Sequence, residues 1–242
     1  MKKSIATLVV LLSSLLFTNC NSENDSTSAQ IQPEKFVKKM LVTGYNDYSE
    51  PIFVGTFEFF YDENKQVSHI TKNVTSTTGN LIESNTYNYS YLNDKITSYS
   101  ITNGNTNEVT YDGNQLLNIG YGNNLEYYTN GNLRKDRFGN ELVYQDNNVT
   151  GFISNPTLYS YDDKKNPFFN HNPYFKIIFD DQFEAYYYRV IAISANNVLI
   201  QNYGSNYSNI IQYENLFPTE IKRINVNSNY MVEKINFEYV SL

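Results

Sequence analysis

Cysteine is almost absent from this 242-residue sequence, in which Cys20 is the only one. A chain with one cysteine cannot form an intramolecular disulfide. Histidine is also scarce: only His69 and His171 are present, without the His-x-x-His spacing or nearby cysteine of a zinc site. No Gly-x-Ser-x-Gly sequence marks a serine nucleophile. The sequence therefore predicts no metal, no cofactor and no catalytic residue, which argues against an enzyme.

Basic residues are fewer than acidic ones. The chain has 18 Lys and Arg residues against 25 Asp and Glu residues, which gives a net charge of −7. Removal of Lys2 and Lys3 with a leader would leave 16 basic residues and change the net charge to −9. Because phosphate backbones repel an acidic surface, this balance argues against nucleic acid as a partner.

Long hydrophobic runs are also lacking. The apolar stretch at residues 5–17 has 13 residues, and at about 1.5 Å per residue it is shorter than the roughly 30 Å core of a bilayer. It follows Lys2 and Lys3 and precedes a short polar exit, which is the pattern of a secretory signal peptide. We therefore expect residues 1–19 to be removed during export.

Cys20 stands where this leader ends. In an exported chain a lone cysteine is either an oxidisable free thiol or a modified one, and its place at a cleavage junction favours the second. Residues 15–20, Leu-Leu-Phe-Thr-Asn-Cys, resemble a lipobox, the signal for transfer of diacylglycerol to the thiol. The resemblance implies lipidation of Cys20 and a membrane partner, because more than one acyl chain gives stable anchoring.

Residues 20–35 predict a lipidated N-terminus followed by a flexible tether. Residues 21–32 are rich in Ser, Asn, Asp and Glu and bury too little apolar surface to fold. Glu23 and Asp25 are similar to the acidic signals that direct some Gram-negative lipoproteins to the cell surface. We therefore expect an outer membrane protein, at the surface or on the periplasmic face, whose residues 36–242 form a single domain.

That domain contains a repeated unit. In each unit polar turn residues separate a Tyr from an aliphatic residue five positions later. Asn, Asp and Gly suit tight hairpin turns, and the abundant Tyr, Phe and β-branched residues favour strands. Tyr alternates with Asn or Ser over residues 87–91, so one face of that strand is aromatic. The fold class predicted is all-β, an antiparallel meander of hairpins with a rolled or barrel-like sheet. The units lie at residues 91–96, 111–116, 128–133 and 144–149, with a longer version at 61–67.

Some of these units resemble known repeats. The pair Tyr-Asp at 61–62, 111–112 and 161–162 is similar to the YD repeats of RHS-type proteins. The segments 159–168, 196–197 and 213–219 look like those of a family of bacterial surface lipoproteins with a porin-like sheet. The resemblance implies a rolled or barrel-like fold and a surface location, and it brings no catalytic residues.

The C-terminal part follows the same plan. Two prolines make residues 166–173 the longest irregular loop expected. Residue types and alternation predict strands at 186–193, 208–213, 220–226 and 232–240, with a turn at 216–219.

Two acidic pairs, Asp162 with Asp163 and Asp180 with Asp181, are candidate functional carboxylates. They could bind Ca²⁺ or act as the two carboxylates of a glycosidase. Turn chemistry is the interpretation that we favour, since Asp is common after strands and no Asp-x-Asp-x-Asp-Gly loop occurs. A glycosidase requires two carboxyl groups that face each other across a cleft, about 5 to 9 Å apart.

Tyr186, Tyr187 and Tyr188 are candidate ligand-binding residues. In a strand at least one of the three would face outwards, and tyrosine rings bind glycans and peptides; the alternative is that they fill the core. The expected partner is therefore a glycan or a protein. The sequence favours a non-enzymatic envelope lipoprotein used for binding or structure over a glycan hydrolase. The third alternative is an assembly factor that pairs with a partner's strand.

Overall fold

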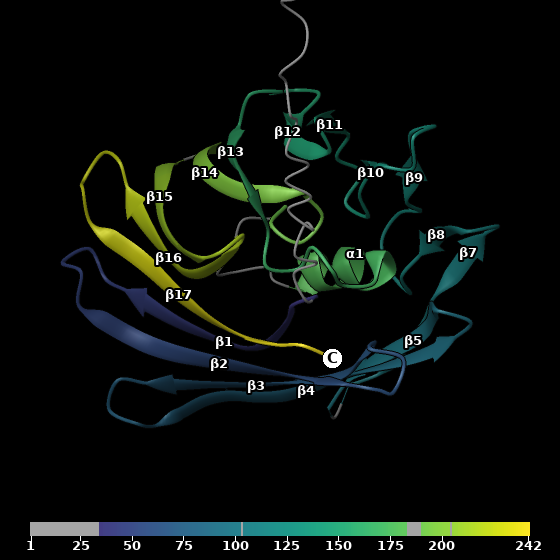
Figure 1. Cartoon of the computed structure of the whole chain (residues 1–242), viewed down its shortest axis with the longest axis horizontal. Helices are drawn as coiled ribbons and strands as arrows, with labels where there is room; N and C mark the ends of the chain where they lie inside the picture. Colours follow the sequence, from purple (N-terminus) through teal and green to yellow (C-terminus); the bar gives the residue numbers. More distant parts are fainter. Residues whose placement is uncertain (1–33, 103, 183–189, 204) are drawn as a thin grey trace, which may run out of the picture. The chain divides into compact units, whose positions relative to one another are not determined.

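Eleven strands form one antiparallel sheet (Figure 1). The computed structural model describes residues 34–102, 104–182, 190–203 and 205–242, within the compact unit Glu34–Leu242. The strands follow the order β13-β14-β15-β16-β17-β1-β2-β3-β4-β5-β6, which confirms the expected antiparallel all-β fold. Their bounds are β1 Phe36–Tyr45, β2 Pro51–Tyr61, β3 Val67–Ser76, β4 Leu81–Leu92, β5 Lys95–Ile101, β6 Thr106–Glu108, β13 Tyr159–Lys165, β14 Asn196–Tyr203, β15 Ser205–Glu214, β16 Phe217–Asn225 and β17 Met231–Val240.

The first and last strands are neighbours in the sheet. Strand β1 pairs with β17 on one side and with β2 on the other. Met40 lies opposite Phe237 of β17 and Phe57 of β2, and all three side chains are buried. Because alternate residues of a strand share one face, a register shift of one residue would expose this row to water.

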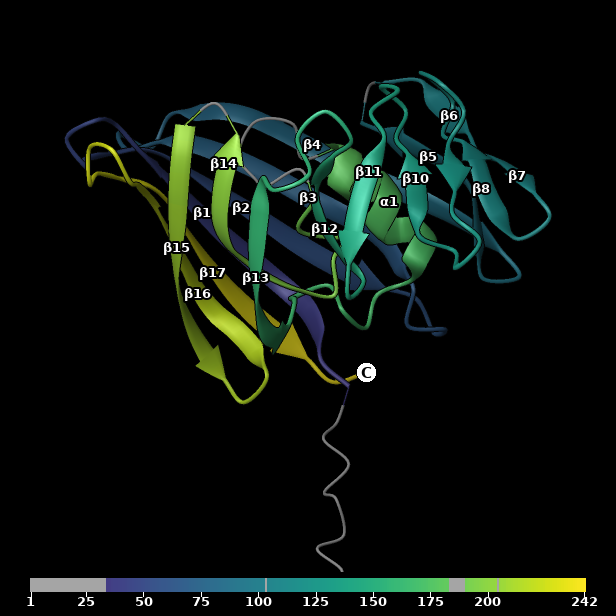
Figure 2. The ribbon, with the colours of Figure 1, turned by 90° about the horizontal axis from the view of Figure 1, so that it is seen from above.

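The sheet is curved and open. Figures 1 and 2 show it bending around a helix that lies on its concave face. The edge strands β13 and β6 do not pair with each other within the described residues. The expected rolled sheet is therefore confirmed, and its two edges do not meet.

Helix α1 (Pro173–Gln182) is the element that the sequence did not predict. Asn172 caps it, because its Oδ1 accepts the N–H groups of Tyr174 at 2.9 Å and Phe175 at 3.3 Å. Pro173 occupies the first turn, where its missing N–H costs nothing. The expected irregular loop is thus confined to residues 166–172. No helix in the described part of the chain has the length and apolar character needed to cross a bilayer.

The helix is stabilised by what it buries. Phe175, Ile178 and Phe179 have the spacing of one helical face, and each is at most 2% exposed. The ring centroid of Phe179 lies 5.6 Å from that of Phe59 in β2, and the ring centroid of Phe175 lies 5.4 Å from that of Tyr89 in β4. Burial of each such side chain contributes about 1.5–3 kcal/mol. Packing against the sheet therefore stabilises a helix whose own helix propensity is modest.

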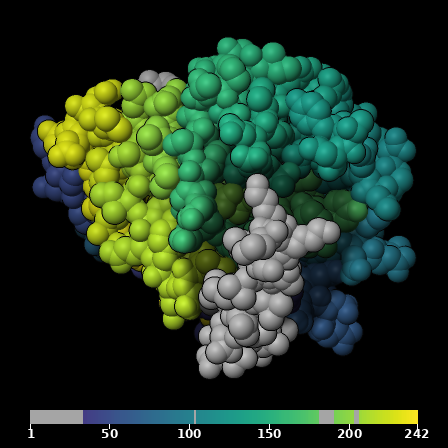
Figure 3. Space-filling view, turned by 45° about the horizontal axis from the view of Figure 1, so that its top comes forward, coloured from purple at the N-terminus to yellow at the C-terminus, as the bar shows by residue number. Residues whose placement is uncertain are grey.

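Three small hairpins follow β6 in the chain. All five predicted Tyr-to-aliphatic units are hairpin connections, and the aliphatic residue of each is buried. These residues are Val67, Ile96, Leu116, Leu133 and Val149. The hairpins are β7 Thr110–Asp112 with β8 Gln115–Asn118, β9 Glu126–Tyr127 with β10 Leu133–Lys135, and β11 Leu142–Gln145 with β12 Asn148–Phe152. In Figure 3 they form the teal surface beside the yellow-green C-terminal strands.

Tyrosine hydroxyls connect successive units. The hydroxyl of Tyr111 donates to the carbonyl oxygen of Ile96 at 2.8 Å. Tyr127 donates to Leu116 at 2.9 Å in the same way. Tyr161 repeats the contact with Val149 at 2.5 Å. The repeat thus has a physical basis: the aliphatic residue fills the core, and in three of the five units its carbonyl accepts a phenol from further along the chain.

Two local predictions near the C-terminus are wrong. Residues 190–193 form turns rather than the end of a strand, and Val190, Ile191 and Ala192 are buried there. The predicted turn at 216–219 begins earlier, because Asn215 has a φ of 58° and β16 starts at Phe217. Aliphatic residues in a buried turn carry the same hydrophobic signal as residues in a strand.

Candidate functional site

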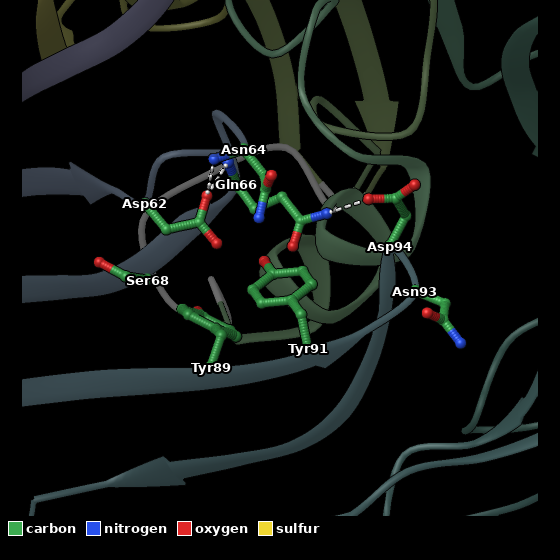
Figure 4. A pocket seen from close by; sticks show the side chains of 8 residues that line it. All are labelled: Asp62, Asn64, Gln66, Ser68, Tyr89, Tyr91, Asn93 and Asp94. Carbon is green, nitrogen blue, oxygen red and sulfur yellow. Dashed lines mark hydrogen bonds between the residues drawn. The ribbon is translucent and has the colours of Figure 1, made fainter.

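A polar pocket lies at one end of the main sheet. It has a volume of about 480 Å³ and lies between the turn that joins β2 to β3 and the turn that joins β4 to β5 (Figure 4). These turns are neighbours because β3 pairs with β4. The residues that line the pocket are Asp62, Asn64, Gln66, Ser68, Tyr89, Tyr91, Asn93 and Asp94, and none of these described residues is cationic.

Asp62 is oriented by its own turn. Its Oδ1 accepts the backbone N–H groups of Asn64 and Gln66, each at 2.9 Å. Lys65, with a φ of 62°, takes the left-handed conformation that closes this turn. Side chains of Asp that bond to the backbone two residues ahead are a common way to fix a turn. The direction of the carboxylate is therefore set before any ligand arrives.

Gln66 and Asp94 link the two turns across the pocket. Gln66 is only 7% exposed and donates from Nε2 to Oδ1 of Asp94 at 2.6 Å (Figure 4). Asn93 and Asp94 have φ values of 50° and 63°, as in a two-residue type I′ hairpin turn. Two rigid turns joined by a charge-assisted hydrogen bond give the pocket fixed walls.

Two tyrosines of β4 contribute to the wall of the pocket. Tyr89 is buried and packs on Phe175 of α1. The hydroxyl of Tyr91 is buried and has no hydrogen-bond partner in the described part of the chain. Burial raises the pKa of Tyr91, and the nearby carboxylate of Asp62 raises it further. The phenol is therefore neutral near pH 7 and can donate a hydrogen bond.

The acidic pair Asp162 and Asp163 is divided between two environments. The carboxylate of Asp162 accepts hydrogen bonds from the hydroxyl of Tyr213 and, at 3.1 Å, from the backbone N–H of Asn197. The side chain of Asp163 is 87% exposed, with Lys164 Nζ 3.4 Å from it. Asp162 therefore joins the three segments 159–168, 196–197 and 213–219, which supports a structural role for it.

The second acidic pair lies at the end of α1. Asp180 raises the pKa of Tyr144 in β11 and of Tyr161 in β13, in addition to the larger effect of burial on each. Asp181 belongs to the same helix, but its side chain lies outside the described structure. No group of three His, Cys, Asp or Glu side chains converges as metal ligands in the residues that the structure describes.

The two histidines lie apart and do not line the pocket. His69 on β3 stacks on Phe60 with ring centroids 4.2 Å apart. His171 is 5% exposed, and its Nε2 lies 3.0 Å from the hydroxyl oxygen of Tyr61. Both positions are explained by packing.

The candidate site residues Cys20, Tyr186, Tyr187 and Tyr188 lie outside the described residues, as do Glu23, Asp25 and the predicted leader at 1–19. The pocket itself was missed, although its two turns coincide with the predicted units at 61–67 and 91–96. The available signal was their placement: with β3 and β4 paired, two turns rich in Asp and Asn must lie side by side.

Comparison with solved structures finds similarity at low sequence identity. No family model and no curated protein matches the chain. The crystal structure of a porin-like protein from Bacteroides uniformis is similar to it, with a TM-score of 0.47 and 11% sequence identity. The similarity covers 84% of this chain and 98% of that one. A function for this chain therefore has to rest on its own residues.

Proposed function

We propose that this protein is a cell-envelope lipoprotein, anchored through acylated Cys20, that carries a non-catalytic β-sheet domain for binding at the outer membrane surface. The observation that carries the proposal is the placement of the only cysteine at the end of an apolar stretch, before a polar segment. That segment leads to a compact unit beginning at Glu34. In an exported chain of this kind the single cysteine has no second cysteine with which to form a disulfide, and it serves as the site of lipid attachment.

Metabolic labelling with a palmitate analogue tests the anchor. The full chain expressed in a Gram-negative host should carry the label and fractionate with membranes. Cys20→Ala should lose the label and leave the membrane fraction, whereas Ser28→Ala in the same polar segment should keep both properties. A Cys20 thiol found unmodified by mass spectrometry would contradict the anchor.

The non-catalytic part of the proposal is supported by the surroundings of Asp162. Its carboxylate accepts hydrogen bonds from Tyr213 and from Asn197, so it is committed to holding three segments together. A general acid or nucleophile needs a carboxylate free to meet its substrate.

A glycan hydrolase remains the second candidate, favoured by one observation: the carboxylates of Asp62 and Asp94 both line the pocket. Incubation of the full chain with soluble neutral and acidic polysaccharides would decide between the two. Release of new reducing ends that is lost in Asp62→Asn would establish hydrolysis, whereas unchanged polymers support binding alone.

The edges of the main sheet give little support to the assembly alternative. Edge strand β6 has three residues, and β13 carries Asp162, Asp163, Lys164 and Lys165 in succession. Short or charged edges discourage pairing with a partner's strand.

A further inference from the structure

We infer that the pocket between the turns of β2–β3 and β4–β5 binds a neutral carbohydrate, one or two sugar units in size. This inference deepens the proposed function, because it names the ligand class of an envelope binding domain. A volume of about 480 Å³ is within the range of roughly 300 to 1,000 Å³ typical of small-molecule sites. It accommodates a sugar unit at the end of a longer chain.

The polar groups of the pocket match those of a sugar. Neighbouring hydroxyls of a sugar each donate and accept, so they are best met by carboxylates beside amides. Asp62 and Asp94 supply charged acceptors, and Asn64, Gln66 and Asn93 supply both donors and acceptors. Because the Asx turn and the bond from Gln66 to Asp94 fix the walls, little side-chain entropy is lost on binding.

The charge of the pocket selects against acidic sugars. Two carboxylates and no cation line it in the described structure. The lysines nearest in the sequence bind other groups. Nζ of Lys65 lies 3.5 Å from Oε2 of Glu34, and Nζ of Lys95 donates to the carbonyl of Gly113 at 2.7 Å. A uronate or sialate would therefore meet like charge without a compensating base.

The hydroxyl of Tyr91 is the second observation that points to a ligand. Three of the other four unit tyrosines donate to backbone carbonyls: Tyr61 to Val37 at 2.5 Å, Tyr111 to Ile96 at 2.8 Å and Tyr128 to Leu142 at 2.8 Å. Tyr91 lines the pocket instead, and its hydroxyl has no partner among the described residues. A buried donor left without a partner carries a cost, which an incoming sugar hydroxyl would remove.

Saturation-transfer NMR on the purified full chain tests the inference. The probes are glucose, galactose, mannose, N-acetylglucosamine and glucuronate, with neutral oligosaccharides for any sugar that responds. At least one neutral sugar should bind and glucuronate should not. Tyr91→Phe should weaken that binding about three- to tenfold, the loss of one neutral hydrogen bond, without lowering the melting temperature.

Tyr111→Phe is the matched control, since it removes a tyrosine hydroxyl that lies outside the pocket. It should lower the melting temperature and leave the sugar affinity unchanged. Asp94→Asn keeps the left-handed turn and an acceptor for Gln66, and it should reduce binding as well. These variants separate a binding role from a role in folding.

Three outcomes would overturn the inference. They are binding of no neutral sugar, equal affinities in Tyr91→Phe and the parent, and binding of Ca²⁺ in place of sugars. None of them bears on acylation of Cys20, and an unacylated Cys20 would leave the sugar measurements unaffected. The two proposals therefore fail separately.

Discussion

The hydroxyl oxygen of Tyr61 lies 3.0 Å from Nε2 of His171, two residues that are 110 positions apart in the chain. The Tyr61 hydroxyl donates to the carbonyl of Val37 at 2.5 Å, so Nε2 carries the proton and donates to the phenol oxygen. The rings of Phe168 and Phe175 lie 5.3 and 5.6 Å from the imidazole. This hydrogen bond joins β2 to the loop that precedes α1, inside an aromatic cluster.

Acid should destabilise the protein through His171. Burial, together with a smaller effect of the charge of Lys176, lowers its pKa from 6.5 to about 3. Between pH 6.5 and 3 the unfolded chain binds a proton at this histidine and the folded protein does not. Stability therefore falls as the pH drops through this window. The slope is about 1.4 kcal/mol per pH unit.

Urea unfolding from pH 7 to pH 4 measures this effect. His171→Gln has no imidazole to titrate, so it should be less stable at pH 7 but lose less stability towards pH 4 than the parent. Parallel curves for the two proteins would show that other groups cause the acid sensitivity.

A rise in pH should destabilise the protein through Glu233 on β17. Burial raises its pKa to about 8, against a smaller opposing effect of Arg223, whose Nη1 lies 3.9 Å away. From about pH 4.5 to 8 the folded protein keeps a proton that the unfolded chain has released, so stability falls as the pH rises. The free energy of unfolding of Glu233→Gln, relative to that of the parent, should therefore be higher at pH 8 than at pH 5. The same difference between variant and parent at both values would contradict the assignment.

The phenol contacts between units should contribute to stability. Tyr127→Phe removes the donor to the carbonyl of Leu116, 2.9 Å away, and should lower the free energy of unfolding by about 1 kcal/mol. Tyr91→Phe removes a hydroxyl without a partner in the described structure and should not lower it. Chemical denaturation of the two variants checks this difference, and equal losses would argue against a role for the carbonyl contact.

Asp162 and Asp163 should respond very differently to the same change. The Asp162 carboxylate accepts from Tyr213 at Oδ2 and from the backbone N–H of Asn197 at Oδ1. Asp162→Asn leaves only one acceptor oxygen for these two donors and should cost about 1.5–3 kcal/mol of stability. Asp163→Asn, at a side chain 87% exposed, should stay within about 0.5 kcal/mol of the parent. Thermal unfolding of both variants gives the comparison, and a destabilised Asp163→Asn would show that the exposed carboxylate has a further role.

The hairpin connections could be predicted because turn chemistry is local. Asn93 and Asp94, like Asp146 and Asn147, have the positive φ values that their residue types favour. Helix α1 escaped prediction because Phe175, Ile177 and Ile178 favour strands, and the sheet that stabilises the helix is assembled from distant segments. Asn172 followed by Pro173 was the local signal for its start.

The pocket was less accessible to sequence reasoning than the fold. Asp62 and Asp94 could be assigned to turns, and the alternation in β4 placed Tyr89 and Tyr91 on one face. The contact between Gln66 and Asp94, 28 positions apart, depends on the pairing of β3 with β4 and on the exact geometry of both turns. Such geometry is set by long-range packing, which one sequence does not reveal.

The pairing of β1 with β17 decides when folding can finish. Until Met231–Val240 is available, Phe36–Tyr45 has no neighbour on one side, and the apolar row at Met40 faces solvent. Loop closure between segments so far apart in sequence is slow. A chain still on the ribosome therefore cannot complete this sheet until residues 231–240 have emerged.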